Sequence, residues 1–428
     1  MSTDETYGFD TRAVHAGQRP DPETGARAMP IYATTSFVFE DVQHAADLFS
    51  LQTFGNIYTR LSNPTTAAFE ERVASLEGGL GGLATASGKS AQLTALLTIA
   101  QEGDHIVSSK ALYGGTFTQF NVTVRRMGID VTFVDFGDPD QVKKAITPKT
   151  KALFGETIGN PGADILDIEL YAGLAHEHGI PLIVDNTFAT PYLCRPMEWG
   201  ADIVIHSATK FIGGHGAVIA GVIVESGLFP FDNGNFPILT EPSPSYHDLN
   251  FWENFREYGY LMRARVEVMR DVGAAISPFN SYLLLLGLET LSLRMQRHVE
   301  NAALVARHLA EHPGVAWVRY PIFDDNRWTD LAKKYLPEGP GAVFSFGLNG
   351  GYDAGVKFIE NVELASHLAN VGDAKSLVIH PASTTHQQVP PEDREGMGIG
   401  SDMIRISVGI ETVEDIISDL DQALEKAK

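Results

Sequence analysis

Short apolar runs alternate with helix-forming stretches through the middle of this 428-residue chain, and this alternation constrains the fold more than any other feature. Seven runs occur between residues 81 and 226: GGLATAS, DHIVSS, DVTFVDF, KALFGE, PLIVDN, ADIVIHS and AVIAGVIVES. Runs of this length without polar alternation are typical of strands covered on both faces. Stretches such as ELYAGLAHEHG would supply helical crossovers between parallel strands. The pattern predicts an α/β fold with a mostly parallel, doubly wound sheet.

The chain divides into three predicted parts. Residues 1–62 have no strong periodicity and contain Pro, Gly and Thr at short intervals, which predicts an extended arm that packs on another surface. Residues 63–285 form the α/β domain, and its first helix begins with Asn63 as cap and Pro64 in the first turn. Residues 286–428 contain a helical apolar repeat, two strand patterns (GAVFSFGLN and MIRISVGIE) and a terminal helix, which together predict a smaller α+β domain.

Composition excludes several classes of partner. Lys and Arg total 32 residues against 54 Asp and Glu, and the formal net charge of −22 disfavours nucleic acid and anionic membrane surfaces. The longest apolar run, AVIAGVIV, is too short to span a bilayer, and the acidic start MSTDETYGFDTR lacks the features of a secretion signal. The single cysteine, Cys194, excludes an intrachain disulfide. We expect a cytoplasmic protein with small-molecule ligands.

Two glycine-containing stretches imitate nucleotide-binding motifs without matching them. GKS at residues 88–90 follows an apolar run, but a triphosphate-binding loop would need its first glycine at position 83, where Leu83 stands. The glycines at positions 79 and 81 precede a predicted strand instead of joining a strand to a helix. The 14 histidines contain no HExxH motif, so no metal site is expected. A non-enzymatic or nucleotide-binding α/β protein is the alternative from a different class.

Polar side chains follow two of the predicted strands where those strands end. Asp185 closes PLIVD, and Ser207, Thr209 and Lys210 follow ADIVIH. In a doubly wound sheet, ligands bind beyond the carboxyl ends of the strands, so these four residues should share one crevice. Taken singly, a loop lysine is more often a solvated surface charge and a strand-end aspartate a helix cap. Their combination in one crevice favours a functional site.

The chemistry of these residue types points to pyridoxal phosphate. A buried lysine such as Lys210 has a lowered pKa, and its neutral amine can form a Schiff base with an aldehyde. A carboxylate such as Asp185 could keep a pyridine nitrogen protonated, which makes the ring an electron sink. The backbone N–H groups of Gly88 and Lys89, at the start of a predicted helix, would form a phosphate cradle together with two hydroxyl groups.

The segment DNTFATPY, followed by GADIVIHSATKFIGGHG, resembles the cysteine/methionine-metabolism family of pyridoxal phosphate enzymes. The resemblance runs over nearly the whole chain and implies the fold of the large aspartate-aminotransferase-like class, fold type I. It implies that Lys210 is the Schiff-base lysine, Asp185 the pyridine partner, and Ser207 and Thr209 phosphate ligands. The family often has methionine at position 89; here a lysine stands there, and the sequence does not fix the direction of its side chain.

Further residues match the family one by one. IYTRLSNPT implies that Tyr58 and Arg60 reach the cofactor phosphate of a neighbouring subunit, so the resemblance implies at least a dimer and typically a homotetramer.

ALYGGT places Tyr113 where the family stacks an aromatic ring on the cofactor, and we count it with Lys210 as catalytic; by itself a core tyrosine would be the preferred interpretation. Asn160 in ETIGNP is similar to the family's residue near the cofactor and the substrate carboxylate. Arg405 in MIRISVGIE suits bidentate capture of that carboxylate. Ser376 resembles a substrate-side residue whose backbone helps place the lysine.

Two segments distinguish the reaction within the family. The insertion at 227–260 and HAGQRPDPETGARAMPIYATTSF resemble the O-acetylhomoserine sulfhydrylases, which implies conversion of O-acetyl-L-homoserine and sulfide to L-homocysteine and acetate in methionine biosynthesis. Cystathionine γ-synthase and methionine γ-lyase activities are the alternatives, because they would use the same residues. The insertion is a candidate lid that would exclude water from the site. The preferred acyl ester and sulfur nucleophile stay open.

Overall fold

The computed structural model describes residues 7–385, 387 and 398–428, and its larger sheet has the strand order β1-β7-β6-β5-β4-β2-β3. The strands are β1 Gly81–Thr85, β2 His105–Ser109, β3 Asp130–Val134, β4 Thr150–Glu156, β5 Leu182–Asp185, β6 Ile203–His206 and β7 Gly221–Glu225. Strand β7 pairs antiparallel with both of its neighbours, and all other neighbouring strands are parallel. The prediction of a mostly parallel sheet is confirmed.

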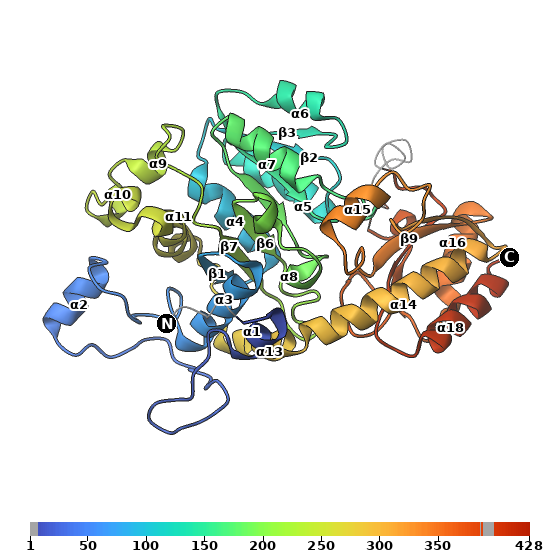
Figure 1. The fold of residues 1–428 in the computed structure, drawn as a ribbon, viewed down its shortest axis with the longest axis horizontal. Helices are drawn as coiled ribbons and strands as arrows, with labels where there is room; N and C mark the ends of the chain where they lie inside the picture. Colours follow the sequence, from blue (N-terminus) through green and yellow to red (C-terminus); the bar gives the residue numbers. More distant parts are fainter. Residues whose placement is uncertain (1–6, 386, 388–397) are drawn as a thin grey trace.

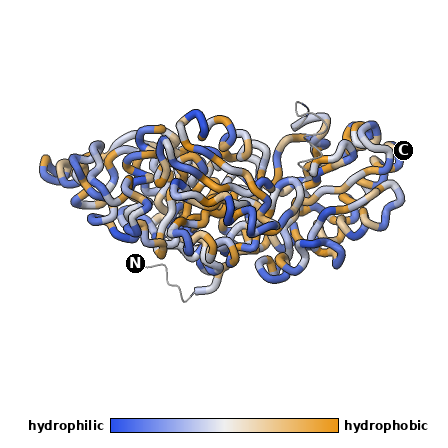
Figure 2. Tube along the Cα trace, turned by 90° about the horizontal axis from the view of Figure 1, so that it is seen from above, coloured by the Kyte–Doolittle hydropathy of each residue, from blue (hydrophilic) through white to orange (hydrophobic). Residues whose placement is uncertain are grey.

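Helices cover this sheet, and apolar residues gather in the interior of the molecule (Figures 1 and 2). The helices of this part outside residues 227–272 are α3 Pro64–Glu77, α4 Gly88–Ile99, α5 Gly114–Thr118, α6 Pro139–Ala145, α7 Ile168–Glu177, α8 Thr190–Leu193 and α13 Pro278–Glu289. Helix α3 begins as predicted: the side chain of Asn63 accepts a hydrogen bond from the N–H of Thr65, and Pro64 occupies the first helical position. Gly78 ends the helix with a φ of 78°, a left-handed conformation that glycine adopts without strain.

The C-terminal part contains a second sheet of order β10-β11-β12-β9-β8. Its elements are α14 Leu291–Glu311, β8 Val315–Arg319, α15 Thr329–Tyr335, β9 Val343–Leu348, α16 Gly351–Asn361, β10 Ser366–His367, β11 Leu377–Ile379, β12 Met403–Ser407 and α18 Val413–Lys426. Strands β9 and β12 and helix α18 were predicted. Strands β10 and β11 were missed because two or three residues are too few to show a periodic pattern. The predicted domain boundary between residues 285 and 286 lies inside helix α13.

The N-terminal arm is partly helical, which differs from the extended arm predicted for residues 1–62. It forms α1 Phe9–His15 and α2 Val42–Phe49, and α2 is capped by the Asp41 side chain, which accepts from the N–H of His44. Figure 1 shows α2 lying away from the body of the molecule. Val38 and Val42 are 96% and 87% exposed, so the arm presents apolar side chains that the other described residues leave uncovered.

The insertion at 227–260 packs at the amino ends of the central strands. It contains α9 Pro237–Thr240, α10 Phe251–Phe255 and the start of α11 Gly259–Arg263. The side chain of Asn233 donates to the carbonyl of Gly179 before β5, and Lys151 at the start of β4 donates to the carbonyl of Asn235. This placement contradicts the expectation of a lid over the same chain's site, because that site lies at the opposite, carboxyl ends of these strands.

Candidate active site

The carboxyl ends of β4, β5 and β6 bring the predicted residues together. Asp185 is the last residue of β5 and pairs with Glu156 of β4 on one side and with Ile205 of β6 on the other. The chain turns directly after β6, and Ser207, Thr209 and Lys210 lie in this turn. Parallel strands that end at the same edge therefore place Lys210 and Asp185 in the crevice expected for a doubly wound sheet.

Lys210 is half-buried, and its ammonium group donates a hydrogen bond to Oδ1 of Asn370, which lies 2.5 Å from Nζ. Burial, together with the positive charge of Arg405, lowers the pKa of Lys210 to about 8. A larger fraction of this amine is therefore neutral and nucleophilic at neutral pH than for an exposed lysine. Asn370 was missed by the sequence analysis; the only local signal is the turn at Gly372, where φ is 73° and an added Cβ would lie 2.7 Å from the backbone nitrogen of Phe211.

Asp185 accepts hydrogen bonds from three donors. Its Oδ1 accepts from the N–H of Thr187 at 3.0 Å and from the Thr187 hydroxyl at 2.5 Å, and its Oδ2 accepts from Nε2 of Gln92 at 2.9 Å. These three donors fix the plane of the carboxylate. The sequence carries no signal for Gln92 or Thr187 at this site, because their side chains reach Asp185 only through the packing of α4 and of the turn after β5.

Helix α4 begins beside Ser207. Ser87 caps the helix by accepting from the N–H of Ser90, and a Cβ added to Gly88 would lie 2.6 Å from the Cβ of Ser207, so a glycine is required for this close approach. Among the described residues, the Ser207 hydroxyl has no hydrogen-bond partner. Thr209 exchanges hydrogen bonds with the backbone of Ala220. A helix N-terminus next to a free hydroxyl group suits an anion such as a phosphate.

The C-terminal part contributes Arg405, on β12, to the same site. Its guanidinium donates to Oδ1 of Asn160 at 3.3 Å and to the carbonyl of Asn370 at 3.4 Å. Burial lowers the pKa of Arg405 to about 10, which leaves it cationic at neutral pH. Tyr113 is 51% exposed, and its backbone N–H donates to Glu156. A fixed cation, an amide and an open aromatic ring thus face the crevice that holds Lys210.

Lys89 directs its side chain away from the turn that contains Ser207 and Thr209. Its Nζ donates to Oε1 of Gln92 at 2.8 Å and to the Thr116 hydroxyl at 2.9 Å. The side chain therefore lies toward the Asp185 side of the crevice, and only the backbone of Lys89 belongs to the predicted phosphate cradle.

The remaining predicted residues have other surroundings. Ser376 is fully buried; its hydroxyl donates to Glu411 and accepts from the N–H of Gly409, so its side-chain bonds are directed into the C-terminal part. A substrate-side role for Ser376 stays a prediction. Tyr58 and Arg60 are exposed and stack on each other, with the guanidinium carbon 5.2 Å from the ring centroid. An exposed pair of this kind is available to another molecule.

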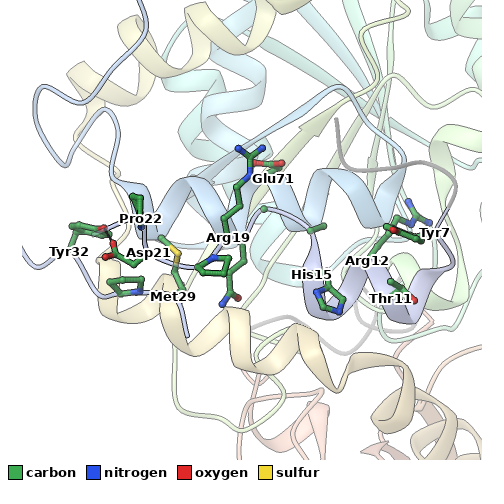
Figure 3. Close-up of a pocket in the computed structure, with 15 residues that line it drawn as sticks. Tyr7, Thr11, Arg12, His15, Arg19, Asp21, Pro22, Met29, Tyr32 and Glu71 are labelled. Atoms are coloured by element: carbon green, nitrogen blue, oxygen red, sulfur yellow. Dashed lines mark hydrogen bonds between the residues drawn. The ribbon is translucent and has the colours of Figure 1, made fainter. Parts of the chain in front are cut away.

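A cavity of about 660 Å³ lies elsewhere, under the N-terminal arm (Figure 3). It is lined by residues of the arm, among them Arg12, His15, Arg19 and Tyr32, and by Glu71 of α3. None of its lining residues belongs to the cluster around Lys210. The cavity is therefore separate from the site that contains Lys210.

The described residues contain neither a membrane-spanning helix nor a cluster of metal-binding side chains. In the part of the chain that the structure describes, no helix is long and apolar enough to cross a membrane. Over the same residues, no group of three or more His, Cys, Asp or Glu side chains is arranged to hold a metal ion. A cytoplasmic location stays a prediction from the sequence.

Comparisons with known proteins identify the family. The family model of Cys/Met metabolism PLP-dependent enzymes matches residues 10–425. An O-acetyl-L-homoserine sulfhydrylase of Thermus thermophilus is 52% identical over 97% of this chain and 99% of its own length, and one of Leptospira meyeri is 51% identical over 97% and 96%. The crystal structure of a putative O-acetylhomoserine (thiol)-lyase from Campylobacter jejuni, which contains N'-pyridoxyl-lysine-5'-monophosphate, aligns with a TM-score of 0.95 at 38% identity, covering 98% of this chain and all of the other. The chain belongs to the family of Cys/Met metabolism PLP-dependent enzymes.

Proposed function

We propose that this enzyme converts O-acetyl-L-homoserine and sulfide to L-homocysteine and acetate, with pyridoxal phosphate attached at Lys210. The observation that carries the proposal is a Lys210–Asp185–Arg405 site in a chain about half identical, over nearly its full length, to O-acetyl-L-homoserine sulfhydrylases. The same reading agrees with a homocysteine synthase of Schizosaccharomyces pombe that is 51% identical over 99% of this chain.

The residues present fit the cofactor. Lys210 supplies an amine whose pKa is lowered to about 8, and Asp185 supplies a carboxylate held by Thr187 and Gln92. The start of α4 and the unpartnered hydroxyl of Ser207 suit the phosphate, and Thr209 is near enough in sequence to join them. The exposed ring of Tyr113 is available to stack on the pyridine ring. The aldehyde, the ring nitrogen, the ring face and the phosphate of the cofactor thus each have a matching side chain or backbone group.

Pyridoxal phosphate, when bound, supplies an aldehyde that links to amines and a ring that withdraws electrons from Cα of an amino acid. Lys210, once its amine is free, removes the proton from Cα and holds it for return. Proton loss from Cα and then from Cβ allows the Cγ–oxygen bond to break and acetate to leave, and sulfide forms the new Cγ–sulfur bond. Asn370 of the same chain accepts a hydrogen bond from the Lys210 amine and holds this amine in place between the proton transfers.

Arg405 and Asn160 orient the amino-acid substrate. The guanidinium of Arg405 is fixed by Asn160 and by the carbonyl of Asn370, and its planar fork matches a carboxylate. Holding the α-carboxylate fixes the direction of the Cα–H bond relative to Lys210, so the base meets the proton it must remove. The same contact favours α-amino acids over amines that lack a carboxylate.

The assay of acyl esters tests this function directly. We expect the highest kcat/KM with O-acetyl-L-homoserine and sulfide, and lower values with O-succinyl-L-homoserine, O-phospho-L-homoserine or L-methionine. Equal or greater turnover of the succinyl ester with cysteine would overturn the choice of reaction in favour of cystathionine γ-synthesis. Release of methanethiol from methionine as the main activity would favour γ-lysis.

The active site is also proposed to be shared between subunits. Tyr58 and Arg60 lie exposed in the N-terminal arm, beside apolar side chains that the chain leaves uncovered. A second copy of the chain would cover these side chains and receive Tyr58 and Arg60 at its own cofactor phosphate. We propose a dimer of this kind as the minimal unit and a homotetramer as the complete assembly.

Mixing two inactive variants tests the shared site. Arg60→Ala and Lys210→Ala should each lose activity alone, but a mixed dimer would contain one site with both native residues. Co-refolded at equal amounts, the two variants should recover about a quarter of the wild-type activity. A mixture that stays as inactive as its components would show that Arg60 and Lys210 act within one chain.

A further inference from the structure

Lys89 is placed where a lysine is electrostatically unfavourable. It is the second residue of α4, and the N-terminus of a helix carries partial positive charge that repels a cation. Burial lowers the pKa of Lys89 to about 8, against the opposing effects of Asp185 and Glu156. A side chain that only needed to be solvated would point outward, but Lys89 points into the crevice. Its position therefore depends on the groups that it meets there.

The contacts of Lys89 lead to Asp185. The ammonium group donates to Oε1 of Gln92, so the amide of Gln92 must present its NH₂ group on the other side. That NH₂ group donates to Oδ2 of Asp185 at 2.9 Å and to the Thr116 hydroxyl at 3.1 Å. Gln92 is 3% exposed, so water does not replace either contact readily. Lys89 and the Asp185 carboxylate thus both require the same orientation of the Gln92 amide.

The positive charge of Lys89 acts on two neighbouring carboxyl groups, those of Asp185 and Glu156. Glu156 is half-buried beside Asp185, and desolvation together with the Asp185 charge raises the pKa of Glu156 well above its usual range, while the charge of Lys89 opposes this shift. Lys89 also lies 5.2 Å from the centroid of the Tyr113 ring, and Gly115 leaves room for it: an added Cβ would lie 3.2 Å from Cε of Lys89. Lys210 and Arg405 are the other cations of the crevice. Removal of Lys89 would leave the carboxyl groups of Asp185 and Glu156 without the ammonium group that now offsets their charge.

We propose that Lys89 is a positioning residue for the cofactor: through Gln92 it orients and electrostatically supports Asp185, the carboxylate opposite the pyridine nitrogen. This inference rests on the proposed placement of pyridoxal phosphate and adds to it a residue where the resembling family often has methionine. It assigns the Lys89 side chain to the ring end of the cofactor and leaves the phosphate end to the backbone of α4, Ser207 and Thr209.

The test compares Lys89→Met, which keeps the length and removes the charge, with wild type. The dissociation constant of pyridoxal phosphate should rise about tenfold in the variant. The pH midpoint of the visible absorbance of the cofactor-loaded enzyme should move upward by on the order of half to one pH unit, because loss of a nearby cation makes protonation of the Lys210-linked group easier. A variant with the wild-type constant and midpoint would overturn the proposal.

Chemical rescue separates charge from shape. In Lys89→Cys, alkylation with 2-bromoethylamine rebuilds an ammonium group at nearly the native position, and wild type treated in the same way is the control. The other cysteine, Cys194, is 4% exposed, and burial raises the pKa of its thiol well above the usual value, which protects it from the reagent. Alkylation, verified by mass, should restore the dissociation constant and the midpoint. An alkylated protein that stays at the level of Lys89→Cys would overturn the proposal.

A double variant tests the route through Gln92. If Lys89 acts through this amide, Lys89→Met should weaken cofactor binding much less in a Gln92→Met background than in wild type. Fully additive losses would overturn that route. A wild-type enzyme that binds no pyridoxal phosphate would instead overturn the cofactor placement, and one that binds it but prefers the succinyl ester would overturn only the proposed reaction.

Discussion

Lys210→Ala is expected to lower kcat by on the order of 10⁴-fold, because in the proposed mechanism Lys210 is both the amine that carries the cofactor and the base that accepts the Cα proton. Two observations support this expectation: burial and Arg405 lower the pKa of Lys210, and Asn370 holds its Nζ at 2.5 Å. Steady-state assays with O-acetyl-L-homoserine and sulfide give the rate, and the visible absorbance at Lys210 should be lost with it.

Lys143→Ala is the matched control, because Lys143 is exposed on α6 and belongs to no part of the site. This control should keep the wild-type rate and absorbance. Borohydride reduction followed by peptide mapping locates the attachment directly in wild type. A pyridoxyl label on a peptide other than the one containing residue 210, or a Lys210→Ala variant with near-normal turnover, would refute the assignment.

Asp185→Asn is expected to lower kcat by on the order of 10²–10³-fold, the range seen when one preorganised electrostatic contact is removed. Asparagine keeps the shape of the side chain but removes the negative charge that we propose holds the pyridine nitrogen in its protonated form. In the variant, the NH₂ group of Gln92 also faces an amide and no longer faces a carboxylate. The measurement is kcat at saturating substrate and cofactor, combined with the absorbance of the loaded enzyme.

Asp202→Asn provides the control for this second prediction. Asp202 is also buried and precedes β6, but it lies at the amino end of the sheet, where it accepts from the N–H of Leu182 and pairs with His176. Its replacement should lower thermal stability and leave kcat unchanged. Equal loss of kcat in the two variants would show that Asp185 acts through the stability of the sheet and not at the cofactor.

The sequence predicted the central α/β fold well because its signals are local. The run PLIVD and the capped helix after Asn63 each carry their own period or cap, and both elements form where they were expected. The arm was harder to predict, because α1 and α2 have only seven and eight residues and give little periodicity. The insertion at 227–260 was misplaced, since its position depends on contacts such as Asn233 with Gly179, more than fifty residues away.

The sequence by itself determined the sheet, the strand ends and the chemical types at them: a lysine, a carboxylate and hydroxyls at the ends of β5 and β6 must share one edge, because parallel strands end together. Only the tertiary structure decided the partners of these groups. Asn370 reaches Lys210 and Gln92 reaches Asp185 across 160 and 93 residues of chain, and Lys89 turns toward Gln92 and not toward the phosphate cradle. Such contacts follow from how separate elements pack, and packing over these separations leaves no period or spacing in the sequence.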